Sequence, residues 1–150
     1  LFKESKVDLR VACHPMRIIS DLKFHNSIKT RIAMPYTMMA NNIKRLIKIK
    51  KNQILDYGLS IKFLSKIKIF KNYCIMRIPL AIGYCLSIII SSGLKDKKIF
   101  LAGFDGFNST NSDMDETDEI IKSFKSKLLN KKLYSLTPTK YSTLIKIKNI

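Results

Sequence analysis

Three groups of residues have the types and spacing to do chemistry, and the first is an aspartate between two glycines. Asp105 lies in the stretch IFLAGFDGF, residues 99–107, where an apolar run ends. Its carboxylate could hydrogen-bond within a tight turn, or it could accept a hydrogen bond from a ligand hydroxyl. Gly103 and Gly106 keep side chains away from this position, which slightly favours a ligand.

A histidine and a cluster of hydroxyls complete the candidate ligand-binding set. His14 follows the stretch VDLRVAC, residues 7–13. An imidazole there could act as a base or donate a hydrogen bond to a phosphate, although a lone histidine beside a proline is also typical of a turn or of packing. The hydroxyl cluster lies in SLTPTKY and consists of Thr137, Thr139 and Tyr141.

The net charge of +17 raises the question of nucleic acid, because clustered lysines and arginines neutralise phosphates. Here the lysines are spread over nearly every segment and alternate with isoleucine and asparagine, as in TLIKIKNI. An AT-rich coding sequence produces that pattern without selection for a partner. The aromatic pattern of an RNA-binding sheet and the spacing of a zinc finger are missing, so nucleic acid is not an expected partner.

Other motifs with strong chemical meaning are also missing from the sequence. It contains no Gly-x-Gly-x-x-Gly, Walker A, nucleophile elbow or His-Glu-x-x-His pattern. The acidic run over residues 113–119 lacks the glycine and the terminal glutamate of a calcium loop, so we expect it to complement a helix dipole instead. No metal site and no cofactor are expected in this segment.

The cysteines indicate a reducing, cytoplasmic setting. Cys13, Cys74 and Cys85 are an odd number without Cys-x-x-Cys spacing, and two of them lie in apolar runs, where a thiol behaves as a small hydrophobic group. The chain begins at Leu1 without a signal peptide, and we expect it to be a piece of a longer polypeptide.

Hydrophobic periodicity alternates between strands and helices along the chain. Strands are expected in the stretches 7–13, 31–35 and 52–58, from residue 99 on, and in LYSLTPTKY from residue 133, where Pro138 ends the strand. Helices are expected in 16–27, 37–50, 78–94 and 113–132. Residues 60–71 fit either an irregular segment or a short helix.

The segment 78–94 raises a membrane question because it carries no charge. A spanning helix needs about 20 apolar residues, and this run contains Pro79, Gly83 and three serines. A buried helix is favoured, with Pro79 near its first turn and Gly93 at its end. No transmembrane segment is therefore expected.

The order of these elements predicts a single α/β domain over residues 1–150, with a Rossmann-like three-layer architecture and a mostly parallel sheet. Ligands of such sheets bind beyond the carboxyl ends of the strands. That rim would carry His14 together with the loops 103–106 and 137–141.

Several stretches resemble known families. IPLAIGYCLSIIISSGLKDKKIFLAGFDGF resembles bacterial sialyltransferase-like Rossmann domains, in which a helix, a glycine, a strand and Gly-Phe-Asp follow one another. It is more closely similar to the domain that follows the barrel in HMG-CoA-lyase-like aldolases, of the 4-hydroxy-2-oxovalerate type, from surface-polysaccharide loci. SLTPTKY and ACHPMRIISD fit that second family too, so short matches are scattered over residues 14–141.

The resemblance implies an accessory or ligand-binding C-terminal domain of a bacterial surface-glycan biosynthetic aldolase, which is a lyase. Its partners would be an upstream aldolase barrel, which would hold a divalent metal, and a nucleotide or sugar acid at the rim. Two alternatives stay open. One is a glycosyltransferase-like enzyme that uses a nucleotide sugar, with Asp105 or His14 as general base, and the other is a purely structural interaction module.

Overall fold

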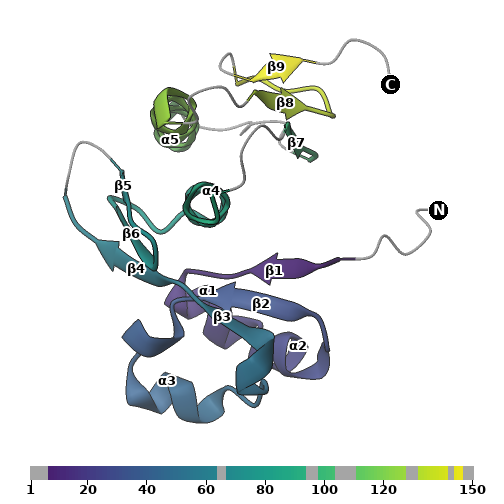
Figure 1. Ribbon diagram of the computed structural model, residues 1–150, viewed down its shortest axis with the longest axis vertical. Coiled ribbons are helices and arrows are strands. Elements are labelled where there is room, and N and C mark those ends of the chain that lie inside the picture. Colours follow the sequence, from purple (N-terminus) through teal and green to yellow (C-terminus); the bar gives the residue numbers. More distant parts are fainter. Residues whose placement is uncertain are drawn as a thin grey trace. The chain divides into compact units, whose positions relative to one another are not determined.

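The computed structural model describes residues 7–63, 67–93, 98–103, 111–127, 132–141 and 144–146. The chain forms two compact units, Leu1–Ser91 and Ser92–Ile150, which we call the N-terminal and C-terminal units and describe separately (Figure 1). The fold belongs to the α/β class, with small and largely parallel sheets. That residues 1–150 form a single domain stays a prediction.

Helices and strands alternate in the N-terminal unit. Its elements are β1 (Leu9–Val11), α1 (Pro15–Ser20), α2 (Leu22–Ser27), β2 (Arg31–Met34), the 3-10 turn η1 (Tyr36–Met38), α3 (Asn41–Leu46), the 3-10 turn η2 (Lys51–Gln53), β3 (Ile54–Asp56), β4 (Gly58–Ile61), β5 (Lys68–Ile69), β6 (Tyr73–Met76) and α4 (Ala81–Ser91).

This unit contains two three-stranded sheets, and the consecutive strands β3 and β4 connect them. β1, β2 and β3 pair in that order and run parallel, with Ile32 of β2 opposite Ile54 of β3. In the second sheet β6 lies between β4, which runs parallel to it, and β5, which runs antiparallel. Only Tyr57 separates β3 from β4, so the chain leaves one sheet and enters the other within a single residue (Figure 1).

The backbone around Tyr57 shows how the pairing partner changes. The Tyr57 amide still donates to the Met34 carbonyl at the end of β2, at 3.3 Å, whereas the Gly58 amide donates to the Asn72 carbonyl ahead of β6, at 2.8 Å. Only glycine fits at position 58, because there is no room for a side chain. A Cβ there would lie 2.8 Å from the Tyr73 Cβ and 2.9 Å from the Met38 Sδ.

The core beside β2 explains why its sequence is apolar almost throughout. Ile32, Ala33 and Met34 are all fully buried, as expected for a strand that is covered on both faces. Ile32 and Met34 form one cluster with Ile18 of α1 and with Met39, which follows η1. The cluster fixes α1 against β2. His14, which caps α1, follows the neighbouring strand β1.

The apolar helix α4 is shorter than the predicted segment 78–94. It begins at Ala81, two residues after Pro79, and packs against β1, β5 and β6. Gly93 follows the last helical residue by two positions and has a φ of +67°, the left-handed conformation that commonly ends a helix at glycine. No helix in the described part of the chain is long and apolar enough to cross a membrane.

The C-terminal unit contains a short parallel sheet and the longest helix described. Its elements are β7 (Ile99–Leu101), α5 (Asn111–Lys127), β8 (Leu133–Ser135) and β9 (Ile145–Lys146). β8 lies between β7 and β9 and runs parallel to both. α5 buries Ile120, Ile121 and Phe124, which recur at helical spacing and form its apolar stripe.

Several element predictions need correction in extent. The predicted helix over 37–50 is wrong for most of its length, since only Asn41–Leu46 is α-helical and a 3-10 turn precedes it. The strand that was predicted from residue 133, with Pro138 at its end, stops earlier, at Ser135. Residues 60–71, left open between an irregular segment and a short helix, contain the end of β4 and all of β5. The strand β6 was not predicted.

Candidate functional site

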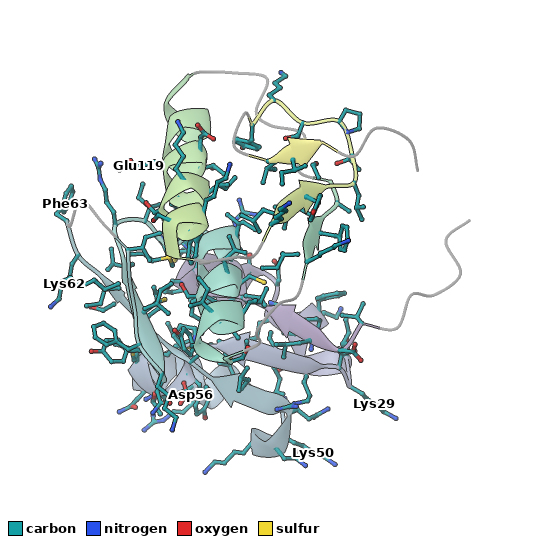
Figure 2. All side chains as sticks on the ribbon, turned by 45° about the horizontal axis from the view of Figure 1, so that its top comes forward. Lys29, Lys50, Asp56, Lys62, Phe63 and Glu119 are labelled. Atoms are coloured by element: carbon teal, nitrogen blue, oxygen red, sulfur yellow. The ribbon has the colours of Figure 1, made fainter. Side chains whose placement is uncertain are left out.

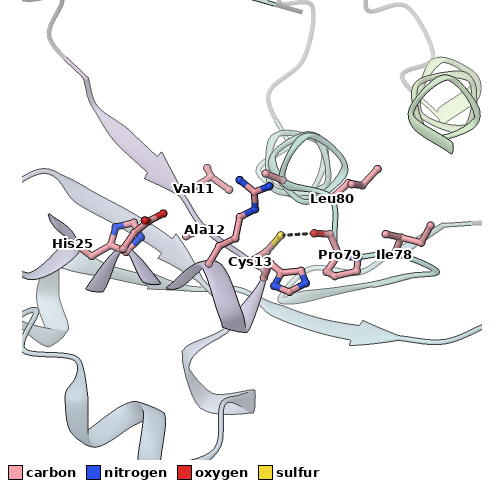
Figure 3. Close-up of a pocket in the computed structure, with 11 residues that line it drawn as sticks. Val11, Ala12, Cys13, His25, Ile78, Pro79 and Leu80 are labelled. Carbon is pink, nitrogen blue, oxygen red and sulfur yellow. Dashed lines mark hydrogen bonds between the residues drawn. The ribbon is translucent and has the colours of Figure 1, made fainter. Parts of the chain in front are cut away.

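A depression of about 490 Å³ opens at the carboxyl end of β1 in the N-terminal unit, where the chain passes into α1. Its polar lining comes from residues 13–25, and its second wall is the segment that leads into α4 (Figure 3). The polar or ionisable residues that line it are Cys13, His14, Arg17, Asp21 and His25, and the apolar ones are Val11, Ala12, Ile78, Pro79, Leu80 and Ala81.

A hydrogen bond joins the two walls. The Cys13 thiol donates a hydrogen bond to the Pro79 carbonyl, with 3.3 Å between sulfur and oxygen (Figure 3). Burial, with a smaller effect from nearby Cys74, raises the pKa of Cys13 to about 12. The thiol therefore stays protonated at neutral pH, where it is a donor and a packing group rather than a nucleophile.

His14 is held at the lip of the depression by the start of α1. Its backbone is extended and its carbonyl accepts the Ile18 amide at 3.0 Å, so that His14 is the N-cap of a helix whose first residue is Pro15. The His14 Nδ1 atom is buried and has no hydrogen-bond partner among the described residues. Buried polar atoms usually have a partner, so a ligand that enters the depression and reaches this nitrogen would satisfy it.

Arg17 and Asp21 bring opposite charges to the same depression. Arg17 lies one turn after His14 and is exposed, as is Asp21 at the junction of α1 and α2. A guanidinium binds a phosphate or carboxylate through paired N–H groups, and a carboxylate accepts hydrogen bonds from hydroxyls. The pair suits a ligand that carries an acidic group and hydroxyl groups together.

His25 forms the far end of the polar wall and is held neutral. Arg10 donates from Nη1 to its Nδ1 at 3.1 Å, and Arg10 also donates to the Thr30 carbonyl at 3.0 Å. Burial, reinforced by the Arg10 charge and opposed in part by Asp21, lowers the pKa of His25. With its Nδ1 accepting, the neutral ring carries its proton on Nε2.

Sequence reasoning found His14 here but missed Arg17, Asp21 and His25. A usable signal was present, because positions 14, 17, 21 and 25 are separated by three, four and four residues. That spacing places polar side chains along one face of a helix, and residues 15–27 are helical apart from Asp21.

A second depression, of about 470 Å³, lies where β3 passes into β4. Thr37, Met38, Asp56, Gly58, Asn72 and Tyr73 line it. Its one carboxylate is engaged, since both oxygens of Asp56 accept from the Thr37 amide at 3.2 Å. Asp56 therefore holds η1 against the end of β3.

The remaining predicted site residues belong to the C-terminal unit. Gly103 follows β7 with a φ of +69°, and its amide donates to the Thr137 Oγ1 at 3.1 Å, so the chains that leave β7 and β8 meet there. Thr139 and Tyr141 are buried, and the Thr139 Oγ1 accepts the Tyr141 amide at 3.2 Å. A ligand-binding role for these four residues stays a prediction.

Asp105 and Gly106 lie outside the described residues. His14 belongs to the other unit, so its sharing one rim with Gly103 and Thr137 also stays a prediction. Within the described ranges, no group of three or more His, Cys, Asp and Glu side chains gathers in a way that could hold a metal ion. Comparisons with protein-family models, with curated proteins and with solved structures find no match to this chain.

Proposed function

We propose that the N-terminal unit binds a small acidic ligand with hydroxyl groups, a sugar acid or a nucleotide, in the depression beside His14. The observation that carries this proposal is the meeting of Arg17, Asp21 and the unpartnered His14 Nδ1 around one opening of about 490 Å³. The opening lies beyond the carboxyl end of β1, where α/β sheets bind their ligands.

Each polar group has a role in this proposal. Arg17 binds the acidic group of the ligand, Asp21 accepts from a ligand hydroxyl, and His14 contributes its free ring nitrogen. Ile78 and Leu80 supply apolar contact for a sugar face or a base on the opposite wall. Small-molecule sites commonly combine such apolar walls with a few convergent polar groups.

The wider proposal is that this chain is an accessory domain of a surface-glycan biosynthetic aldolase, with a three-layer Rossmann-like fold. Two observations support it: the resemblance of residues 78–107 to that family, and the predominance of parallel pairing in the sheets. The aldolase chemistry would belong to the upstream barrel. Purified 1–150 should then release no pyruvate from 4-hydroxy-2-oxo acids in the presence of divalent metal, and metal-dependent release would overturn this wider proposal.

The ligand proposal is tested by calorimetric titration of the chain with nucleotides, nucleotide sugars and sugar acids. Arg17→Gln should weaken binding of whichever compound binds the wild type by about tenfold or more, because a charge-assisted hydrogen bond is lost. Arg31→Gln is the matched control, since Arg31 is also exposed and lies at the start of β2, whereas the depression lies beyond the carboxyl end of β1. Equal loss in both variants, or no binding of any compound, would leave the domain as a structural module.

A further inference from the structure

The edge of the N-terminal unit where the strands of the β1–β2–β3 sheet begin carries a concentration of positive charge. Residues 22–55 contain eight lysines and arginines and no aspartate or glutamate. Five exposed lysines of this stretch form what we call the basic face: Lys23, Lys29, Lys48, Lys50 and Lys51.

Two polar side chains bring the segments of the basic face together. Asn26 of α2 donates to the Leu46 carbonyl at 3.2 Å and accepts the Lys48 amide at 2.8 Å, which ties α2 to the chain after α3. Gln53 of η2 donates to the Lys29 carbonyl, which ties η2 to the chain ahead of β2. Lys23 lies three residues before Asn26, on the same side of α2.

The strand register confirms that these segments are neighbours. Ile32 pairs with Ile54, so the residues just ahead of β2 lie beside those just ahead of β3, and these include Lys29 and Lys51. Figure 2 shows Lys29 and Lys50 extending from the same part of the ribbon into solvent. Asp8 is the one described acidic residue at this edge, and it precedes β1, which is separated from β3 by β2.

The other acidic side chains described in this unit lie elsewhere. Asp21 lines the depression beside His14, and Asp56 accepts from Thr37 at the carboxyl end of β3. The unit therefore has two different edges. One edge carries the candidate ligand site with Asp21 and, at the end of β3, Asp56, and the other carries the five lysines of the basic face.

We propose that the basic face binds the surface of a membrane that contains anionic lipids. Charge complementarity requires an anionic partner, and several observations favour a lipid surface over a nucleic acid. The five lysines have long and flexible stems, which suit a fluid layer of headgroups, and the exposed Arg31 lies two residues after Lys29 at the start of β2. Leu46 is 50% exposed beside them and can enter the interfacial layer. Phe24, which follows Lys23 on α2, is 57% exposed and, like Leu46, is an apolar side chain of the kind that enters this layer.

This binding would orient the unit on the membrane. With its basic face against the headgroups, the edge that holds Arg17 and Asp21 points away from the lipid and stays open to solutes. The proposal is independent of what occupies that site, because it rests on other residues.

Co-sedimentation with vesicles tests the proposal. Vesicles of phosphatidylcholine with 30% phosphatidylglycerol should bind the chain at 0.1 M salt, and vesicles of phosphatidylcholine alone should not. The triple variant Lys48→Gln, Lys50→Gln, Lys51→Gln should bind about a hundredfold more weakly, since each lysine near such a surface strengthens binding roughly fivefold. Raising the salt concentration to 0.5 M should abolish wild-type binding.

A second triple variant keeps the test specific. Lys62→Gln, Lys68→Gln, Lys71→Gln removes the same charge from exposed lysines around β4, β5 and β6, and it should weaken binding by less than about fivefold. Equal losses in the two variants would assign the effect to net charge and overturn the proposal, as would absence of binding to the anionic vesicles. A third overturning result is tighter binding to a 20-nucleotide RNA or a DNA duplex, at the same salt and with the same dependence on Lys48 to Lys51. Melting curves of both variants confirm that they fold.

Discussion

The hydroxyl of Tyr84 donates a hydrogen bond to the backbone carbonyl of Tyr57. Tyr84 lies on α4 and is fully buried, and its ring meets the Tyr57 ring edge to face at 5.7 Å between centroids. The Tyr57 hydroxyl lies 3.0 Å from the carbonyls of both Phe70 and Tyr73, to which its single proton can donate. One helix, the junction of two strands and the β5–β6 turn are thus connected through two side chains.

Removing the Tyr84 hydroxyl should destabilise the chain measurably. Tyr84→Phe keeps the ring packing but leaves the Tyr57 carbonyl without this buried donor, and we expect a loss of about 1–3 kcal/mol in the free energy of unfolding. Urea unfolding followed by circular dichroism measures it. Tyr73→Phe is the control, because Tyr73 is 39% exposed and stacks on Phe70 through its ring. Similar losses in the two variants would contradict the assigned role of the Tyr84 hydroxyl.

Gly58→Ala tests the close packing at the junction of β3 and β4. The new methyl group would meet the Tyr73 Cβ at 2.8 Å, and this neighbour is fixed by the pairing of β4 with β6. Overpacking of this kind costs about 1–3 kcal/mol, which a lowered melting temperature would report. Adding Met38→Ala removes the sulfur at 2.9 Å and should restore only part of the loss. A melting temperature unchanged by Gly58→Ala would show that the junction has spare room.

His25 should make the stability of the chain depend on pH. Its pKa is lowered in the folded chain by burial and by Arg10, whereas the unfolded chain binds a proton near pH 6.5. Below that pH the unfolded state takes up a proton that the folded state still excludes, so stability falls as the pH decreases through the interval between the two pKa values. Above pH 6.5 the full contribution is present.

Urea unfolding at pH 7.5 and pH 5.5 measures this effect. His25→Asn should lose less stability between the two values than the wild type, because its amide oxygen can still accept from Arg10 and the side chain does not titrate. A variant with the same pH dependence as the wild type would assign the effect to other groups.

The cysteines should react slowly with thiol reagents in the native chain. All three are free, and burial raises the pKa of Cys74 to about 11 and that of Cys13 to about 12. At pH 8 roughly a thousandth as much of Cys13 is then in the thiolate form as at the ordinary pKa of 9.0. In the variant Cys74→Ser, Cys85→Ser, absorbance with Ellman's reagent should rise slowly in buffer and within minutes in urea. Rapid reaction in buffer would show that the Cys13 site opens readily.

Local patterns predicted the elements that carry their own signal. β2 was expected from RIAMP, and α4 from the apolar run with Gly93 after it, because a covered strand and a buried helix both need apolar residues. β6 was missed since YCIM is four residues long and carries no alternation. Its strand conformation depends on pairing with β5 across the short turn 70–72 and with β4, from which residues 62–72 separate it.

The candidate site was predictable only in part, because only some of its residues are marked by a local sequence pattern. His14 stands at a strand end that periodicity locates. Arg17 and Asp21 belong with it only because α1 and α2 continue the same helical face, and Pro79 only because Cys13 meets its carbonyl across 66 positions in the sequence. A contact between residues so far apart has no local pattern.

Because a single residue separates β3 from β4, the number of residues here decides which face of the sheet each side chain of β4 lies on. Successive side chains of an extended strand point to opposite faces, so one inserted residue at Tyr57 would reverse every side chain of β4 relative to β3. Two inserted residues would keep the faces but shift the register with β6. An ordinary loop accepts either insertion. Here the pairing of β3 with β2 and of β4 with β6 depends on the same number of residues. Homologous sequences should therefore differ in loop length while the number of residues from β3 to β4 stays constant.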